Sequence, residues 1–411
     1  MPLTLLFDLD DTLLDNDQNA FFAAFYSTLA GSLSRHATAE EIARGIQSGV
    51  QAMFINNDPA TTLVDAFYEH FLAAVPSADP AALRADVDAY YHQVYPALST
   101  HTAPRPEAVE LVNWAFSQGY RIGIVTNPVF STFAVEERLR WAGLPPEKHP
   151  FVLLTSNESF HFVKSPAYFA EVMARLGWPE DPALVVGDDL HLDVIPARTL
   201  GLAVYHVAVP SMAPDASPSP NGSVTAANGS GGIASLRAWL EASDLSKFKP
   251  APTSPEAILA TLLSTPAGLA VLIKDIPAEH WTHGPGSDAW GLTEIICHLR
   301  DVDAEVNIPR VEAILEESNP FIPAQETNGW AEDRGYAQQN GREALHVFTE
   351  TRKRLVTKLA ALRPEDWRRR ARHSVFGPTD LREMAGISAE HDRSHVRQVF
   401  QLLPQIDGCH A

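Results

Sequence analysis

The first twelve residues place two carboxylates at a spacing that suits a metal ion. Asp8 and Asp10 follow an apolar run, in the pattern Asp-x-Asp-x-Thr that ends at Thr12. Side chains of an extended chain alternate with a period of two, so both carboxylates point to the same side. Carboxylate oxygens suit hard cations such as Mg²⁺, and like charges this close repel one another unless a cation or a proton compensates. The pair therefore predicts a cation site at the end of a strand.

Three later segments carry further polar side chains, two of them directly after apolar runs and one just before a helical pattern. Ligands of open α/β sheets bind outside the carboxyl ends of the strands, so we expect these side chains to meet there. They are Thr126, Asn127, Lys164, Asp188, Asp189 and Asp193.

A second set of candidate ligands lies near the end of the sequence. His391 and His395 stand four residues apart, which places both imidazoles on one face of a helix. His298 lies on the apolar face of another helical segment. Three histidines with an open position are typical of a catalytic metal site, and imidazole suits Zn²⁺, Ni²⁺ or Fe²⁺.

Five short apolar runs predict strands, and helical patterns separate the later ones. Continuous apolar runs are typical of strands that are buried on both faces of a parallel sheet. The alternation predicts an α/β doubly wound domain. The predicted strands are Leu3–Phe7, Arg121–Thr126, Phe151–Thr155, Leu184–Gly187 and Ala203–Val207.

Between the first and second predicted strands, roughly residues 16–103 read as helix throughout. Aromatic residues recur there at helical spacing, as at Phe21 and Phe25. We expect this insertion to cover the strand ends as a cap, with its aromatic residues in the cap core.

Composition changes divide the rest of the chain. A Ser/Pro/Gly-rich stretch from Val209 to Gly232 predicts a long mobile loop, and residues 243–255 predict a linker. Four amphipathic segments follow, which predict an all-α four-helix bundle: Glu256–Lys274, Leu292–Glu317, Arg342–Leu362 and Asp380–Leu403. The predicted domains are therefore 1–242 and 256–411.

The charge and the cysteine content exclude several classes of protein. A net charge of -20 over 411 residues argues against a nucleic-acid surface and against binding to anionic lipid. The two cysteines, Cys297 and Cys409, provide no disulfide framework. We also expect no membrane span and no signal peptide, and hence a cytoplasmic protein.

In their order and spacing, the motifs of the first half resemble the haloacid dehalogenase-like (HAD) hydrolases with a helical C1 cap. The resemblance implies that Asp8 is the nucleophile of an aspartyl-phosphate intermediate and that Asp10 is the general acid and base. It implies that Thr126 and Asn127 bind the phosphoryl group and that Lys164 neutralises charge. A Mg²⁺ site would comprise the Asp8 carboxylate, the Asp10 backbone carbonyl, Asp188 and a further acid. Asp193 is the favoured further acid, and Asp189 stays open.

The second aspartate of the motif bears on the reaction type. Dehalogenases of this superfamily generally lack it, because a halide leaving group needs no proton. The presence of Asp10 therefore favours a phosphatase. A phosphonate-type hydrolase is less favoured because the cap region is poor in lysine. The cap type implies a small phosphorylated metabolite as the substrate.

The second half resembles the DinB/YfiT-like family of metal-binding four-helix bundles. The resemblance rests on Trp290-Gly291-Leu292 before His298, on Phe376-Gly377-Pro378-Thr379, and on the pair His391 and His395. It implies a three-histidine metal site. Two alternatives stay open: the bundle is a metal-dependent thiol transferase and provides the main activity, or it is a non-catalytic interaction module. A homodimer through the bundle is a further expectation.

Overall fold

The computed structural model describes residues 2–208, 227–282, 284 and 289–407. The chain forms two compact units. The first comprises Met1–Asn57, Thr61–Ser165 and Glu180–Ala251, and the second comprises Asp58–Ala60, Pro166–Pro179 and Pro252–Ala411. The break between Ala251 and Pro252 falls inside the predicted linker. The sequence did not indicate that residues 166–179, which contain helix α7 (Pro166–Arg175), group with the second unit.

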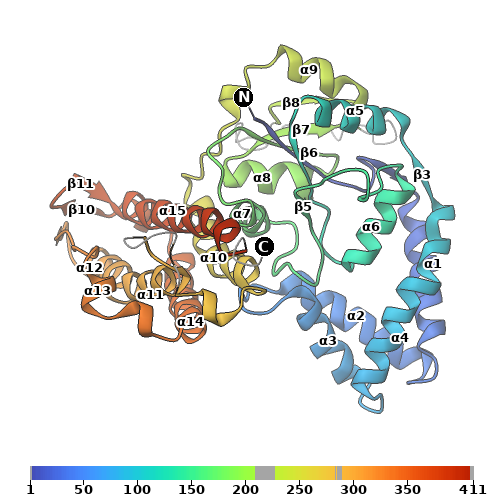
Figure 1. The fold of residues 1–411 in the computed structure, drawn as a ribbon, viewed down its shortest axis with the longest axis horizontal. Coiled ribbons are helices and arrows are strands. Elements are labelled where there is room, and N and C mark those ends of the chain that lie inside the picture. The colour runs from blue at the N-terminus through green and yellow to red at the C-terminus, as the bar shows by residue number, and fades with distance from the viewer. Residues whose placement is uncertain (1, 209–226, 283, 285–288, 408–411) are drawn as a thin grey trace. The chain divides into compact units, whose positions relative to one another are not determined.

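The first unit is built on a six-stranded parallel sheet with the strand order β5-β4-β1-β6-β7-β8. The five predicted strands are present, and β8 was missed because it lies within the predicted loop. The strands are β1 (Thr4–Phe7), β4 (Arg121–Ile124), β5 (Leu153–Leu154), β6 (Ala183–Gly187), β7 (Ala203–Val207) and β8 (Gly229–Gly231). The helices that the first unit adds to this sheet, visible in Figure 1, are α5 (Pro106–Ser117), α6 (Thr132–Trp141), α8 (Ile195–Leu200) and α9 (Leu236–Ala242). The predicted α/β doubly wound class is confirmed.

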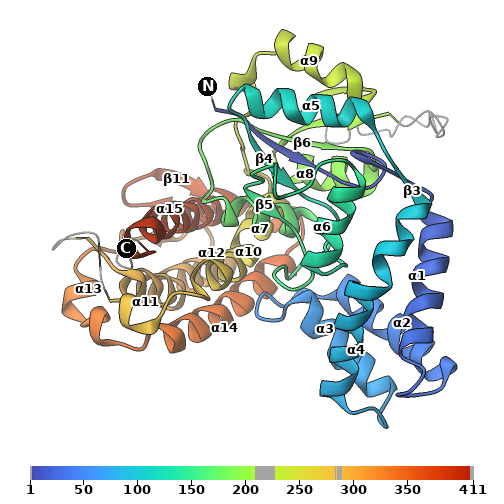
Figure 2. The ribbon, with the colours of Figure 1, turned by 45° about the vertical axis from the view of Figure 1, so that its right-hand side comes forward.

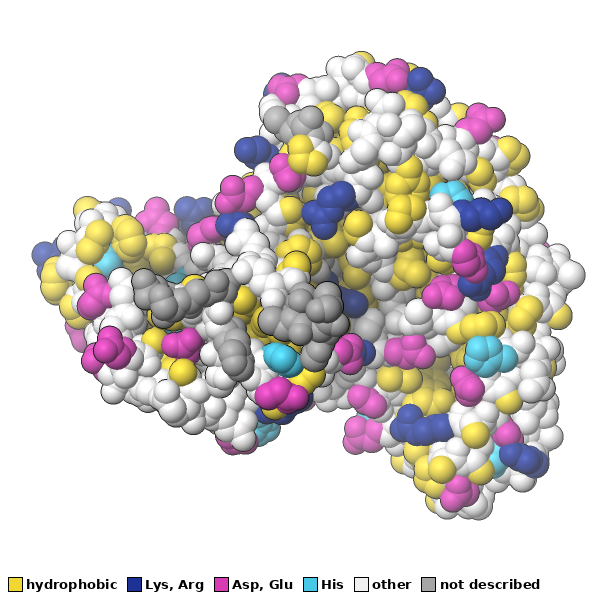
Figure 3. Space-filling model, viewed as in Figure 1, with side chains coloured by type: hydrophobic (Ala, Val, Ile, Leu, Met, Phe, Trp, Pro, Cys, Tyr) yellow, Lys and Arg dark blue, Asp and Glu magenta, His cyan; other side chains and the backbone are white. Residues whose placement is uncertain are grey.

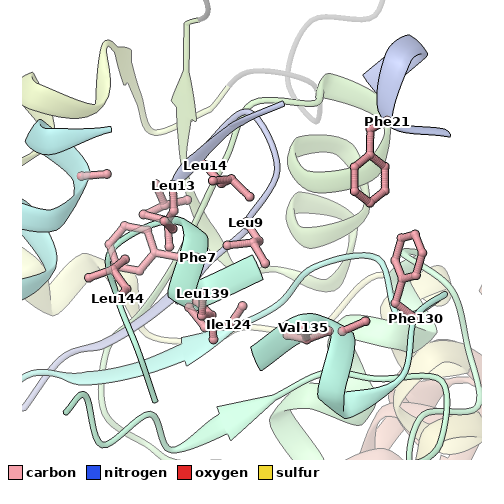
Figure 4. Packing of buried hydrophobic residues seen from close by; sticks show 14 of the residues in the cluster. Phe7, Leu9, Leu13, Leu14, Phe21, Ile124, Phe130, Val135, Leu139 and Leu144 are labelled. Atoms are coloured by element: carbon pink, nitrogen blue, oxygen red, sulfur yellow. The ribbon is translucent and has the colours of Figure 1, made fainter. Parts of the chain in front are cut away.

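Apolar residues on both faces of the sheet explain why the strands pair at its centre. All four residues of β1 and all five of β6 are buried. Figure 4 shows Phe7 and Ile124 of neighbouring strands close to Leu139 and Leu144. The same cluster includes Phe21 and Phe130, which continue the core toward the cap. Beyond β1 the chain turns sharply, with Asp11 at a φ of 55°.

The predicted cap is an insertion of four helices (Figure 2). The chain enters it through β2 (Leu14–Asn16) and leaves through β3 (Thr102–Pro104), and these two short strands pair with each other. Thr38 and Glu41 form a capping box that fixes the start of the second helix. The helices are α1 (Gln18–Ser32), α2 (Ala39–Ile55), α3 (Leu63–Ala74) and α4 (Pro80–Gln93), followed by the 3₁₀ turn Tyr95–His101.

The second unit is a helical bundle, so the predicted all-α class is confirmed. Its long segments are α10 (Pro255–Ile273), α11 (Leu292–Val302) with α12 (Ile308–Glu316), α14 (Gly341–Ala360) and α15 (Leu381–Asp407). Figure 2 shows α11 beside α14. A π-helical turn, Asp303–Asn307, joins α11 to α12 without breaking the segment. Three short strands that the sequence did not indicate lie at one end: β9 (Phe321–Ile322), β10 (Arg370–His373) and β11 (Gly377–Asp380).

The expectation that the chain has no stretch long and apolar enough for a membrane span needs correction. Helix α10 is long and apolar enough to cross a membrane by length and composition, contrary to the expectation that no stretch approaches a span. Of the most apolar 18-residue stretch of this helix, 67% is buried inside the structure, as is typical of a core helix of a bundle. Most of the predicted mobile loop, residues 209–226, lies outside the described residues, as does Cys409.

Candidate active site and metal centre

Lys164 lies between two carboxylates at the carboxyl end of the sheet. Its ammonium group donates to Asp8 Oδ1 at 2.6 Å and to Asp193 Oδ1 at 2.5 Å, and all three side chains are buried. Asp8 follows β1 directly, and Asp193 lies in the π-helical turn Leu190–Val194 after β6. The structure therefore brings together residues that lie more than 150 positions apart in the sequence.

A third carboxylate completes this group. Asp188 accepts a hydrogen bond from Thr12 Oγ1 at 3.1 Å, and carboxylate oxygens of Asp8, Asp188 and Asp193 lie within 4.8 Å of one another. Burial, together with the charge of Asp8, raises the pKa values of Asp188 and Asp193. Three carboxylates, of which Asp8 and Asp193 are buried and Asp188 is half-buried, share one ammonium group, which leaves an excess of negative charge. An oxygen donor set of this kind fits Mg²⁺. Asp8, Asp188 and Asp193 would hold the ion.

The positions of Asp189 and Asp193 bear on the alternative left open by the sequence. Asp189 Oδ1 accepts the backbone N–H groups of His191 and Leu192, so this side chain caps the π-helical turn. Asp193 instead points back toward Lys164 and accepts from the Asp189 backbone through Oδ2. A Cβ atom on Gly187 would lie 2.3 Å from Asp193 Cγ, so the glycine makes room for this carboxylate. The geometry favours Asp193 as the further metal ligand.

Asp10 has a partner that the sequence did not reveal. The guanidinium group of Arg138, from α6, forms an ion pair with Asp10 Oδ1, and Asn16 Nδ2 donates to the same oxygen at 3.4 Å. Arg138 is only 2% exposed and lies over the rings of Phe21 and Phe130. Burial raises the pKa of Asp10 to about 6, although Arg138 opposes the shift. Arg138 stands next to the apolar Leu139 in a helix that packs on the core. A charged residue at such a position was the sequence signal that could have indicated a buried ion pair.

Thr126 and Asn127 lie beside this group, after β4. Thr126 is buried, and its backbone carbonyl accepts from Thr155 Oγ1 at 2.9 Å. Asn127 Oδ1 accepts the backbone N–H of Lys164 at 3.2 Å, which holds the lysine loop in place. Both residues line the same cavity as Asp8 and Lys164, and this cavity has a volume of about 790 Å³. The predicted site residues of the first unit therefore share one cavity.

The three predicted histidines of the second unit also come together. His391 Nε2 lies 3.1 Å from His298 Nε2 and 3.2 Å from His395 Nε2. Burial lowers the pKa values of His298 and His391 to about 3, and it also lowers that of His395. Neutral imidazoles with converging Nε2 atoms are the donor set that a divalent transition metal needs, so the residues present fit such an ion.

Side chains around the histidines fix their orientation. His395 Nδ1 is 2.9 Å from Gln398 Oε1. The ring of Trp290 stacks on His395 with 6.1 Å between centroids and also contacts His298, with 4.9 Å between ring centroids. Trp290, which belongs to the motif that carries the resemblance, therefore forms one wall of the histidine site.

A buried ion cluster includes Asp392, which follows His391 in α15. Arg352, from α14, pairs with Asp303 of the π-helical turn and with Asp392, and it donates to the Leu262 carbonyl at 2.8 Å. All three charged side chains are fully buried or nearly so. The arginine therefore connects α10, α14, α15 and the π-helical turn, which together position the histidines.

Models of two protein families match the chain in separate regions. The model of the haloacid dehalogenase-like hydrolases matches residues 3–201, and that of the DinB superfamily matches residues 261–399. The first region contains the carboxylates and Lys164, and the second contains the three histidines.

Individual relatives are distant. A glyceraldehyde 3-phosphate phosphatase of Methanopyrus kandleri is 27% identical over 218 residues, which cover 50% of this chain and 84% of the relative. The solved structure of a HAD phosphatase from Thermococcus onnurineus is 19% identical, with a TM-score of 0.37, and covers 58% of this chain and 98% of its own. YfiT from Bacillus subtilis, a four-helix bundle, is 18% identical with a TM-score of 0.35 and covers 39% of this chain and 94% of its own.

Proposed function

We propose that the chain is a Mg²⁺-dependent phosphatase fused to a metal-binding bundle, because residues 3–201 match the model of the haloacid dehalogenase-like hydrolases and residues 261–399 match that of the DinB superfamily. Its substrate would be a phosphate monoester. The observation that carries the proposal is the contact of Lys164 with Asp8, at 2.6 Å, within a group of three carboxylates whose oxygens lie within 4.8 Å of one another. The phosphatase from Methanopyrus kandleri among the relatives supports the reaction class.

In the proposed reaction, a carboxylate oxygen of Asp8 attacks the phosphorus atom and the bond to the ester oxygen breaks, leaving an aspartyl phosphate. Lys164 compensates the charges of the nucleophile and of the phosphoryl group, which would otherwise repel one another. Thr126 lies at the same cavity wall, where its hydroxyl can bind a phosphoryl oxygen. A bound Mg²⁺ ion would supply further charge compensation.

Asp10 is the proposed proton carrier. It protonates the departing alkoxide, and its carboxylate then removes a proton from the water that attacks the aspartyl phosphate. Its pKa of about 6 suits both tasks near neutral pH. A halide would need no such proton, so the presence of Asp10 supports an ester over an organohalide substrate.

Chelation tests the metal requirement of the whole chain. We expect EDTA to abolish hydrolysis of p-nitrophenyl phosphate and Mg²⁺ to restore it, because the carboxylates repel an anionic ester without a cation. The readout is p-nitrophenol release before and after addition of Mg²⁺. Full activity after exhaustive chelation would exclude the proposed metal role.

Arg138 is expected to position Asp10, so Arg138→Met should impair proton transfer more than binding. We expect kcat for an alkyl phosphate to fall about 10²-fold, because alkoxides leave poorly without a proton. The fall for p-nitrophenyl phosphate should be smaller, because its leaving group needs less help. Arg140→Met, on the same helix and partly exposed, is the matched control. An equal loss for both esters would indicate a structural role only.

The three-histidine group favours a second candidate function, metal-dependent thiol transfer in the bundle. The alternative of a non-catalytic interaction module requires no metal. We expect His391→Ala to lose bound transition metal, measured by elemental analysis of the full chain, because the two remaining imidazoles bind the ion weakly. His346→Ala, an exposed histidine of α14, should keep the metal. An equal metal content in both variants would contradict the site.

A further inference from the structure

We propose that the cavity of the first unit accepts a phosphate ester whose alcohol portion is large and apolar, rather than a small polyhydroxylated metabolite. This inference rests on the proposed phosphatase function. It goes further because it concerns the part of the substrate that leaves with the ester oxygen. The polar and apolar side chains that distinguish the two kinds of substrate line the cavity that contains Asp8 and Lys164.

The cavity is too large for a small ester alone. Its volume of about 790 Å³ lies in the upper part of the range of about 300–1,000 Å³ that is typical of pockets for drug-sized ligands. The polar residues Asp8, Thr126 and Lys164 form one end. A phosphoryl group at these residues would leave most of the volume for the remainder of the substrate.

Aromatic side chains form the wall on the side of α1. Phe22 and Phe130 stack with 6.2 Å between their ring centroids, and Phe25 meets Phe130 edge-on at 5.3 Å. Tyr26 continues this row, 6.0 Å from Phe22, and remains 40% exposed. Rings arranged in this way offer flat apolar surface to a ligand, starting close to the core.

The wall formed by α2 and α3 is apolar and rigidly packed. It includes Val50, Met53, Phe67 and Phe71. A Cβ atom at Gly49 would lie 2.6 Å from the Phe67 ring, and one at Gly45 would lie 2.4 Å from the Phe71 ring. The two glycines let the helices approach closely and hold both rings in place. The apolar wall is therefore preformed.

The cap helices add few charged groups to the cavity lining, although Gln18 and three tyrosines also line it. Among the described residues, the charged side chains that the cap helices add to the lining are Arg84 and Asp88, and both are exposed. The Arg84 guanidinium group already lies 3.7 Å above the ring centroid of Tyr68. Figure 3 shows hydrophobic side chains at the surface of the cap, in the lower right of the view.

The energetics of desolvation decide between the two substrate classes. Hydroxyl groups of a sugar or triose phosphate would lose water against the aliphatic and phenylalanine side chains of these walls, which offer no hydrogen-bond partners, and this loss is unfavourable. An alkyl or aryl group would replace water at apolar surface, which is favourable. The walls therefore select for an apolar leaving group. The ester bond still breaks as in the proposed reaction, and the product is an apolar alcohol and phosphate.

A comparison of alkyl phosphates tests the inference on the full chain. Ethyl and octyl phosphate have leaving alcohols of similar acidity, so a difference between them reports contacts with the chain. We expect kcat/KM to be roughly 100-fold or more higher for octyl phosphate. Glycerol phosphate should be no better than ethyl phosphate. Equal or faster turnover of glycerol phosphate would overturn the inference, whereas no turnover of any ester would instead overturn the proposed phosphatase function.

Variants of neighbouring residues locate the effect in the cavity. Phe54 lines the cavity and is 49% exposed, whereas Ile55 is 66% exposed and does not line it. We expect Phe54→Ala to lower the ratio of octyl to ethyl kcat/KM severalfold and Phe67→Ala to lower it about tenfold. Ile55→Ala should leave the ratio unchanged. Because Phe54 is half exposed, its variant stays informative if Phe67→Ala fails to fold, and an unchanged ratio in Phe54→Ala would contradict the proposed binding surface.

Discussion

Replacing Asp8 with Asn is expected to lower kcat for p-nitrophenyl phosphate by about 10³-fold or more. The amide cannot attack phosphorus as a carboxylate does, and it also removes one ligand of the proposed cation site. The residue is buried beside Lys164, which would keep its hydrogen bond to the amide oxygen. The variant should therefore fold, and its unfolding temperature should stay near that of the parent chain.

The matched control is Asp181→Asn, which makes the same chemical change at an exposed aspartate of the first unit. It should retain full activity. Steady turnover by Asp8→Asn at a rate near that of the control would show that another group attacks the ester.

Replacing Arg352 with Met is expected to destabilise the bundle by about 3–5 kcal/mol. The substitution leaves two buried carboxylates, Asp303 and Asp392, without the cation that pairs with both. It also leaves the Leu262 carbonyl without its donor. Uncompensated charge in the interior costs far more than the loss of one surface ion pair.

Hydrogen exchange of backbone amides in α14 and α15 measures this effect within the full chain, without requiring the two units to unfold together. Arg354→Met is the control, because Arg354 lies on the same helix and is exposed. Protection factors in Arg352→Met that match those of the control would show that the buried ion cluster does not stabilise the bundle.

Much of the fold could be predicted because the strong patterns are local. In each apolar run of the sheet and each amphipathic segment of the bundle, the local pattern of residues predicts which side chains are buried. The short strands were missed for the same reason. Strand β8 is Gly-Ser-Gly, and β10 carries three basic side chains, so their pairing depends on neighbours that the local sequence does not reveal.

Of the residues in the candidate site, those next to a local motif could be predicted, and those that depend on long-range packing could not. Asp8, Lys164 and Asp188 were predicted because each follows or precedes a recognisable element. Arg138 was not, because its ion pair with Asp10 spans 128 positions and depends on how α6 packs. The choice between Asp189 and Asp193 likewise depended on backbone geometry, since only the π-helical turn determines which carboxylate faces Lys164.

The most direct test of the central claim, a covalent phosphoryl group on Asp8, uses the Asp10→Asn variant with p-nitrophenyl phosphate. This leaving group departs without an acid, whereas water attack on the intermediate needs Asp10 as a base. We predict a burst of p-nitrophenol that matches the enzyme concentration, followed by slow turnover. Borohydride should then reduce the acyl phosphate, which releases phosphate and leaves homoserine at position 8. Steady release without a burst, and with Asp8 unmodified, would contradict the mechanism.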